Sequence, residues 1–184
     1  MVLDDALPIA LVGLSGAGKS TVAPLIAARL GISAIDLDAA VEEAGGASVA
    51  ALFVAEGEAA FRDREEKALE RALQRGPCVI ACGGGLVLRA RARAALRARC
   101  RTVWLEVPPV MAAERTNSGG GDRPLLAGGE AGARLAELLE ARAGFYAEVA
   151  AVRVATAGRS PAEVAACVCR ALGVDEEHRG RPCA

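Results

Sequence analysis

The sequence predicts an α/β fold in which a parallel β-sheet carries helices on both faces, and three observations support this prediction. Short apolar runs alternate with longer segments of helical periodicity along the 184 residues, and repeated strand–helix–strand units are typical of parallel sheets. The first apolar run leads into a glycine-rich loop that opens a helix, as at the ligand-binding edge of such sheets. Neither an internal repeat nor a linker divides the chain, so we expect one domain.

The expected elements follow from these runs and from the glycines between them. The strands are expected at residues 9–14, 32–36, 78–82, 102–107 and 152–156, and the helices at 18–30, 39–44, 48–56, 58–74, 89–99, 109–116, 133–148 and 161–172. Residues 117–132 are too rich in glycine and too long for an ordinary connection, so we expect a lid there. The domain would then span residues 1–173 and would be followed by a flexible tail at 174–184.

Composition and charge exclude several classes of protein. The 22 basic and 23 acidic residues nearly balance, which argues against a general binder of nucleic acid or of acidic membranes. No stretch approaches the length of a membrane span, and Asp4 and Asp5 stand where a signal peptide carries positive charge, so we expect a cytoplasmic protein. We also expect a monomer. The cysteines show no paired spacing and are expected to be structural rather than metal ligands; they are residues 78, 82, 100, 167, 169 and 183.

The stretch GLSGAGKST at residues 13–21 carries the GxxxxGK[ST] pattern of a phosphate-binding loop. Its backbone N–H groups would surround a β-phosphate, Lys19 would neutralise β- and γ-oxygens, and the Ser20 hydroxyl would hold Mg²⁺. A GTPase is excluded because Asn117, the only asparagine, is followed by serine, so no Asn-Lys-x-Asp segment exists. The predicted nucleotide-binding residues of the loop are Gly13, Gly16, Gly18, Lys19, Ser20 and Thr21.

Two carboxylates follow the second expected strand. Asp36 and Asp38 lie at the carboxyl edge of the sheet, where open α/β sheets bind their ligands. One could steer Mg²⁺ through water while the other accepts a hydrogen bond or proton from an attacking hydroxyl. Helix N-capping by Asp38 explains the same pattern equally well, so both interpretations stay open at this point.

Charged residues fall within the apolar stripes of two expected helices. In the helix at 58–74, Arg62 and Glu65 are three residues apart and lie inside the stripe, so they can pair there. In the helix at 133–148, Arg142 lies near the middle of the stripe. Two inward-facing arginines suggest an acceptor that carries a carboxylate. A buried ion pair without any ligand is the alternative for the first helix.

Three adjacent glycines, Gly83, Gly84 and Gly85, follow the third expected strand at the same sheet edge. They contribute no side chain to a core, so we expect something to approach their backbone closely. We favour a small polar ligand that accepts hydrogen bonds from the backbone N–H groups. A tight strand-to-helix turn is the alternative.

The arginine-rich segment at residues 89–101 lacks interleaved aromatic residues, so we expect a solvated helix face rather than a nucleic-acid site. That face would carry Arg89, Arg93, Arg97 and Arg101. Trp104, in the fourth expected strand, is predicted to belong to the core.

Taken together, these segments resemble the shikimate kinase family, small P-loop enzymes with the nucleoside-monophosphate-kinase fold. The likeness covers nearly the whole chain, from the phosphate loop through DLD (36–38), FRDREE (61–66), GGG (83–85), RPLLAG (123–128) and RAGFY (142–146) to GRSP (158–161). The resemblance implies a P-loop three-layer α/β/α sandwich whose five parallel strands lie in the order 2-3-1-4-5. It also implies transfer of the γ-phosphoryl of ATP to the 3-hydroxyl of shikimate, a step of chorismate and aromatic amino-acid biosynthesis.

The family pattern assigns roles to individual residues around the acceptor. Lys19, Asp38 and Arg123 would be the catalytic residues, with Asp38 as the candidate base and Arg123 reaching the transferring phosphate from the lid. Asp36 would support Mg²⁺ together with Ser20. The residues implied to bind shikimate are Asp38, Arg62, Gly84, Arg142, Phe53, Phe61, Glu65 and Pro124.

The same pattern places Arg115 and Arg159 against adenine and Arg123 against the phosphates. Two departures stand out. Cys82 occupies a position where the family often has threonine, and the lid begins with the glycine-rich stretch NSGGGD at 117–122. Three rival functions remain from the residues alone: a kinase of another hydroxy acid such as gluconate, a nucleoside-monophosphate kinase, and a catalytically inactive P-loop binding module.

Overall fold

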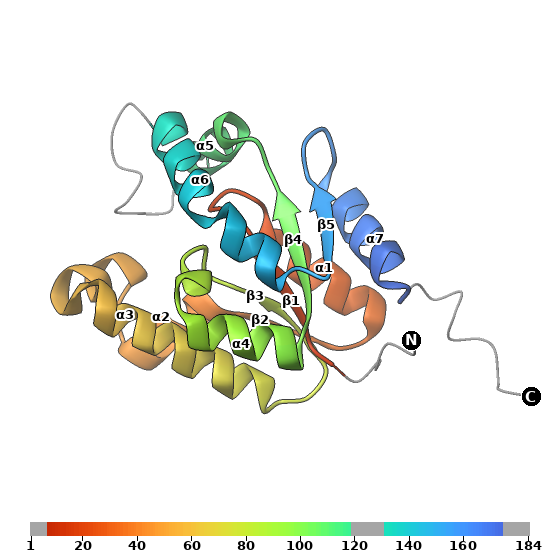
Figure 1. Ribbon diagram of the computed structural model, residues 1–184. Helices are drawn as coiled ribbons and strands as arrows, with labels where there is room; N and C mark the ends of the chain where they lie inside the picture. The colour runs from red at the N-terminus through yellow and green to blue at the C-terminus, as the bar shows by residue number, and fades with distance from the viewer. Residues whose placement is uncertain (1–6, 119–130, 175–184) are drawn as a thin grey trace, which may run out of the picture.

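The computed structural model describes residues 7–118 and 131–174 of the chain (Figure 1). Five parallel strands form one sheet in the order β2-β3-β1-β4-β5, which confirms the expected order. The strands are β1 (Ile9–Val12), β2 (Ser33–Asp36), β3 (Cys78–Ala81), β4 (Arg101–Glu106) and β5 (Val152–Ala155).

Each predicted helix is present, with ends that differ from the prediction by about two residues or fewer. The helices are α1 (Lys19–Leu30), α2 (Leu37–Gly45), α3 (Val49–Leu73), α4 (Ala90–Arg99), α5 (Pro109–Ser118), α6 (Ala131–Val149) and α7 (Pro161–Leu172), with a 3₁₀ helix η1 (Leu86–Leu88) that was not predicted. The two helices expected at 48–56 and 58–74 are segments of α3 that meet at a kink, where Gly57 has φ 79° and ψ 170°.

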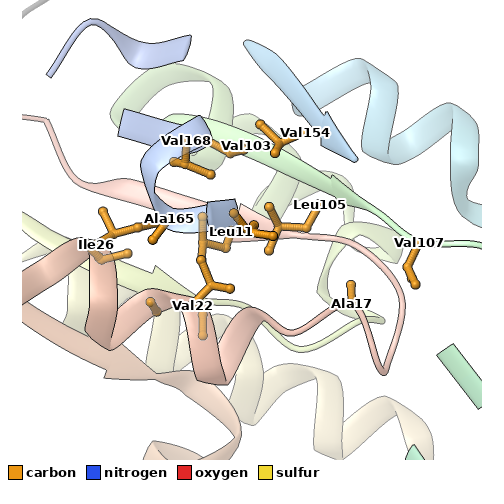
Figure 2. Packing of buried hydrophobic residues seen from close by; sticks show 14 of the residues in the cluster. Leu11, Ala17, Val22, Ile26, Val103, Leu105, Val107, Val154, Ala165 and Val168 are labelled. Carbon is orange, nitrogen blue, oxygen red and sulfur yellow. The ribbon is translucent and has the colours of Figure 1, made fainter. Parts of the chain in front are cut away.

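The core consists of two apolar clusters, one on each face of the sheet. Alternation along β1 divides the strand between them, since Leu11 belongs to one cluster and Val12 to the other. On the first face, side chains of α1 and α7 such as Val22 and Val168 pack against β1, β4 and β5 (Figure 2). On the second face, α3, α4 and the end of α6 cover the sheet, and Trp104 is buried there as predicted. The three-layer α/β/α arrangement is therefore confirmed.

The parallel register gathers the chemistry-bearing loops at one edge. Ala81, the last residue of β3, pairs with Leu11 on one side and with Asp36 on the other. The segments that follow β1, β2 and β3 therefore emerge side by side at the carboxyl ends of the strands. This edge is where ligands bind in open α/β sheets.

The arginine-rich segment corrects the prediction of a solvated face. Arg101 is buried, because it begins β4 instead of continuing α4, and its Nη2 donates to the carbonyl of Leu172 at the end of α7. Arg89 and Arg93 form ion pairs with neighbouring helices. Arg97 alone of these four is exposed, as expected.

Two other expectations concern residues that are only partly described. The expected lid at 117–132 lies mostly outside the described residues, and so does nearly all of the expected tail at 174–184. Within residues 7–118 and 131–174, no helix combines the length and the apolar character needed to cross a membrane. The five cysteines in these ranges form no disulfide with one another, and no group of three or more His, Cys, Asp or Glu residues there could hold a metal ion.

Candidate active site

The phosphate loop connects β1 to the first turn of α1. Gly18 is the N-cap residue of α1, has φ 88°, and leaves the first-turn N–H groups without a side-chain cap. These N–H groups and the helix dipole make the start of α1 suitable for an anion. Lys19 is buried, and its Nζ donates to the carbonyl oxygens of Gly13 and Leu14 at 2.8 and 2.7 Å.

Two glycines of the loop, Gly13 and Gly16, are required by both conformation and space. Gly16 has φ +79°, and a Cβ there would overlap with the backbone carbonyl of Ala112 in α5. A larger residue would therefore push the loop and α5 apart.

A cavity of 430 Å³ opens in front of this loop. In its wall, Arg115 donates to Thr156 Oγ1 at 3.0 Å and to the carbonyl oxygen of Thr156 at 3.1 Å, and Arg159 donates to the carbonyl of Ala155. The residues that line the cavity are Gly16, Ala17, Gly18, Lys19, Ser20, Thr21, Val22, Asp36, Asp38, Cys82, Gly84, Arg115, Thr116, Thr156, Arg159, Pro161 and Val164. Of the residues predicted to bind the nucleotide, the structure thus brings together all except Gly13, which does not line the cavity, and Arg123, which lies outside the described residues.

Cys82 lies at the inner wall of this cavity. Burial raises the pKa of its thiol well above the ordinary value of 9.0, so the side chain stays neutral. A neutral thiol is a poor ligand for a hard cation, which distinguishes this position from the threonine often found in the family.

The two carboxylates after β2 have different local roles. Asp36 caps α2, since its Oδ1 accepts from the backbone N–H groups of Asp38 at 2.9 Å and Ala39 at 3.3 Å. The N-cap interpretation was therefore correct in kind but placed on the wrong aspartate, because α2 begins at Leu37. Asp38, in the first turn, has no such capping role and lines the cavity.

Ser20, Asp36 and Asp38 supply oxygen atoms to the same cavity. Hydroxyl and carboxylate oxygens, completed by phosphate and water, are the donors that Mg²⁺ prefers. The donor set therefore fits a magnesium ion held with the phosphates rather than by a closed protein cage.

Arg62 and Glu65 form a buried ion pair on α3, as predicted. The two residues are only 6% and 1% exposed, and Arg62 Nη1 lies 2.6 Å from Glu65 Oε2. Arg62 Nη2 reaches the exposed Glu58 at 3.1 Å. Burial raises the pKa of Glu65, the charge of Arg62 opposes this rise, and Asp38 adds to it.

Arg142 reaches the glycine turn from α6. The residue is 8% exposed, and its Nη1 donates to the carbonyl oxygen of Gly84 at 3.2 Å. Tyr146, one turn further along α6, donates to the same oxygen at 2.6 Å. The sequence analysis did not identify this polar contact of Tyr146, which only the folded chain reveals.

At two of the three positions in the glycine turn, the ion pair of Arg62 and Glu65, rather than a ligand, leaves no room for a Cβ. A Cβ at Gly83 would overlap with the carboxylate of Glu65 and would lie 2.8 Å from Asp38 Oδ1. A Cβ at Gly85 would overlap with the guanidinium of Arg62. The expectation of a close approach is confirmed, but at these two positions its cause is the protein's own side chains.

A second cavity, of 420 Å³, is lined by the ion pair, by Arg142 and by the glycine turn. The rings of Phe53 and Phe61 meet edge to face in its wall, with centroids 5.7 Å apart. Predicted residues that line it are Asp38, Phe53, Phe61, Arg62, Glu65, Gly84 and Arg142, and residues that sequence reasoning missed include Ser15, Glu42, Ser48, Val49, Leu135 and Leu138. Arg123 and Pro124 lie outside the described residues.

The two cavities share a wall made of Ser20, Asp36, Asp38 and Gly84. One cavity therefore presents a phosphate loop and the other presents two arginines, and a carboxylate stands between them. This geometry suits transfer of a phosphoryl group from a nucleotide to a small anionic acceptor.

Comparisons with known proteins agree with this geometry. A family model described as shikimate kinase matches residues 15–173. Shikimate kinases of Symbiobacterium thermophilum and Rhodococcus jostii are 45% and 40% identical to the chain, over 86% and 84% of it and 91% and 90% of their own lengths. A solved structure of shikimate kinase from Acinetobacter baumannii in complex with shikimate is 32% identical, covers 96% of both chains and superposes with a TM-score of 0.87. The chain therefore belongs to the shikimate kinase family, the enzymes that phosphorylate shikimate at the expense of ATP.

Proposed function

We propose that this chain transfers the γ-phosphoryl of ATP to the 3-hydroxyl of shikimate, giving ADP and shikimate 3-phosphate for chorismate and aromatic amino-acid biosynthesis. The observation that carries the proposal is the shared wall of the two cavities, because a nucleotide in one and an acceptor in the other would meet at Asp38. Family membership supports the same reaction.

The acceptor side supplies the groups that shikimate requires. Arg62 and Arg142 would bind its carboxylate, since both guanidinium groups line the same cavity and are largely buried. Glu65, Asp38 and the backbone of Gly84 would bind the ring hydroxyls, while Phe53, Phe61 and Pro124 would contact its carbon skeleton.

The reaction centre lies at the shared wall. Asp38 would orient the attacking hydroxyl and accept its proton, and Lys19 would neutralise charge on the transferring phosphoryl. Arg123 would approach the same group. Ser20 and Asp36 would hold Mg²⁺, which supplies charge neutralisation at the β- and γ-oxygens when it is bound. Arg115 and Arg159, which line the nucleotide cavity, would contact the adenine.

We also propose how the protein is organised. Residues 1–173 would form one kinase domain with a lid at about 117–132, and 174–184 would be a flexible tail. The enzyme would act as a cytoplasmic monomer on two small-molecule substrates, ATP and shikimate, without nucleic-acid or membrane partners.

Release of ADP, measured with shikimate, gluconate and nucleoside monophosphates side by side, tests the function. We expect turnover with shikimate and little with the other acceptors. Turnover with gluconate or a nucleoside monophosphate but not with shikimate would overturn the proposal. Absence of turnover with every acceptor would indicate an inactive binding module. Arg142→Ala should raise KM for shikimate by about tenfold or more while KM for ATP stays unchanged. Arg91→Ala, at an exposed position of α4, is the matched control.

A further inference from the structure

Arg93, on α4, contacts both η1, which directly follows the glycine turn, and the helix that carries Arg142. Its Nη1 donates to the carbonyl oxygens of Val87 at 2.8 Å and Leu88 at 3.3 Å. Its Nε donates to Glu148 Oε2 at 2.8 Å, and its Cζ lies 4.3 Å from the centroid of the Phe145 ring. A single guanidinium therefore joins η1 to α6 through hydrogen bonds, an ion pair and a cation–π contact.

These contacts act close to Arg142 along the chain. Phe145 and Glu148 follow Arg142 by three and six residues on α6, so they belong to the next turns of the same helix. Val87 and Leu88 follow Gly84, whose carbonyl accepts from Arg142, by three and four residues. Arg93 thus joins α6 to residues 87 and 88, which is a second connection beside the hydrogen bond from Arg142 to Gly84.

Arg142 depends on such support because its side chain is long and its guanidinium is buried. Ordering a side chain of this length costs rotamer entropy, and a displacement of about 1 Å in a positioning group can cost on the order of 100-fold in rate. Arg93 is not among the described residues that line either cavity, so it acts on the acceptor only through other residues.

We propose that Arg93 is a positioning residue of the acceptor site: it fixes α6 against residues 84–88 and thereby holds the guanidinium of Arg142 beside Gly84. The effect on catalysis rests on the proposed function, in which Arg142 binds the carboxylate of the acceptor. The effect on the position of Arg142 does not.

Arg97 provides a matched control on the same helix. Its side chain is 61% exposed against 15% for Arg93, and among the described residues it forms an ion pair with Glu148 at 3.8 Å. Arg97 therefore shares a partner with Arg93 but does not reach the glycine segment through any hydrogen bond among the described residues.

Steady-state kinetics of Arg93→Ala, Arg93→Lys and Arg97→Ala test the proposal. Arg93→Ala should raise KM for shikimate about tenfold, with KM for ATP changed less than about twofold. Loss of folded enzyme alone would lower the apparent kcat without moving KM, so the two causes are separable. Arg93→Lys should recover part of the change, because a cation remains, and Arg97→Ala should match the parent.

A double variant tests whether Arg93 acts through Arg142. KM for shikimate in Arg93→Ala/Arg142→Ala should equal that of Arg142→Ala alone, because the group being positioned is gone. Multiplication of the two effects, or a parental KM in Arg93→Ala, would overturn the proposal. If Arg93→Ala does not fold, Arg93→Lys and Glu148→Gln carry the same comparison.

A crystal structure of the Arg93 variant supplies a readout that needs no substrate. The distance from Arg142 Nη1 to the Gly84 carbonyl oxygen, 3.2 Å in the parent, should lengthen beyond hydrogen-bonding range. An unchanged distance would overturn the positioning role. If the parent does not phosphorylate shikimate, the proposed function fails, and this distance still decides whether Arg93 positions Arg142.

Discussion

Arg142 and Tyr146, one helical turn apart on α6, both donate to the carbonyl oxygen of Gly84, at 3.2 and 2.6 Å. One backbone oxygen of the glycine turn therefore accepts hydrogen bonds from two side chains of α6 and joins the turn to this helix. Burial raises the pKa of Tyr146 to about 12, so its hydroxyl remains a proton donor across the neutral range.

Tyr146→Phe should therefore weaken the turn without introducing a new charge. The carbonyl of Gly84 keeps Arg142 as a donor, so we expect a loss of about 1 kcal/mol in the free energy of unfolding, together with a modest rise in KM for shikimate. Urea denaturation and steady-state kinetics measure the two effects. Unfolding and KM both equal to the parent would show that the Tyr146 hydrogen bond does not support the site.

Asp38→Asn should lower kcat by about 10² to 10⁴ while the affinity for ATP persists, because the amide can occupy the site but cannot accept the proton of the attacking hydroxyl. Single-turnover assays report the chemical step, and calorimetric titration reports nucleotide binding. Asp63→Asn, at an exposed position of α3, is the control and should behave like the parent apart from its ion pair with Arg89. Parental turnover in Asp38→Asn would remove Asp38 from the catalytic role.

Gly83→Ala should destabilise the protein by roughly 1–3 kcal/mol, since the new Cβ would overlap with the carboxylate of Glu65 and crowd Asp38. Gly144→Ala is the matched control, because its Cβ would project into open space on α6 and should stabilise the helix by about 0.5–1 kcal/mol. Thermal or urea unfolding compares the two variants. Equal stabilities would contradict the close packing of the ion pair against the glycine turn.

The raised pKa of Glu65 gives stability a dependence on pH. Because the folded state holds the Glu65 proton more tightly than the unfolded chain, whose pKa is near 4.5, this contribution is fully present below that value. It is lost as pH rises through the folded pKa. The sign therefore predicts a free energy of unfolding that falls with rising pH in that window.

Arg62→Met should increase the dependence of the free energy of unfolding on pH, since it removes the charge that opposes the rise in the pKa of Glu65. The loss of stability should then extend to higher pH. Urea denaturation at a series of pH values measures the slope. Arg64→Met, which breaks an ion pair with Glu56 on the surface of α3, should change the slope only near and below pH 4.5, because Arg64 lowers the pKa of Glu56, and should keep the parental slope above that pH. A parental slope in Arg62→Met as well would mean that the two charges are not coupled.

Periodicity was sufficient to find three charged residues that point inward, although it missed the buried Arg101. Arg62, Glu65 and Arg142 were placed in apolar stripes by counting positions along a helix, and all three are buried. The strands and helices followed from apolar runs and glycines within about two residues at most ends. The order of the strands could not follow from such local patterns and came from the resemblance to a family.

Features that depend on contacts between residues distant in sequence could not be predicted from local sequence patterns. The reason for Gly85 lies in Arg62, which belongs to another element, and the partner of Arg93 is Glu148, 55 residues away. Boundary errors had a similar cause. A helix that begins two residues early moved the cap from Asp38 to Asp36.

The short partition between the two cavities has a consequence for ligand design. A single molecule that placed a phosphate mimic at Lys19 and a carboxylate at Arg142 would gain from tethering, because seating one half raises the effective concentration of the other. Phosphate loops recur throughout the nucleotide-binding proteins, whereas Arg62 and Arg142 line the second cavity, where we propose that they bind the carboxylate of the acceptor. In such a compound the phosphate mimic at Lys19 would contribute affinity, and the carboxylate at Arg142 would contribute selectivity for this enzyme over other nucleotide-binding proteins.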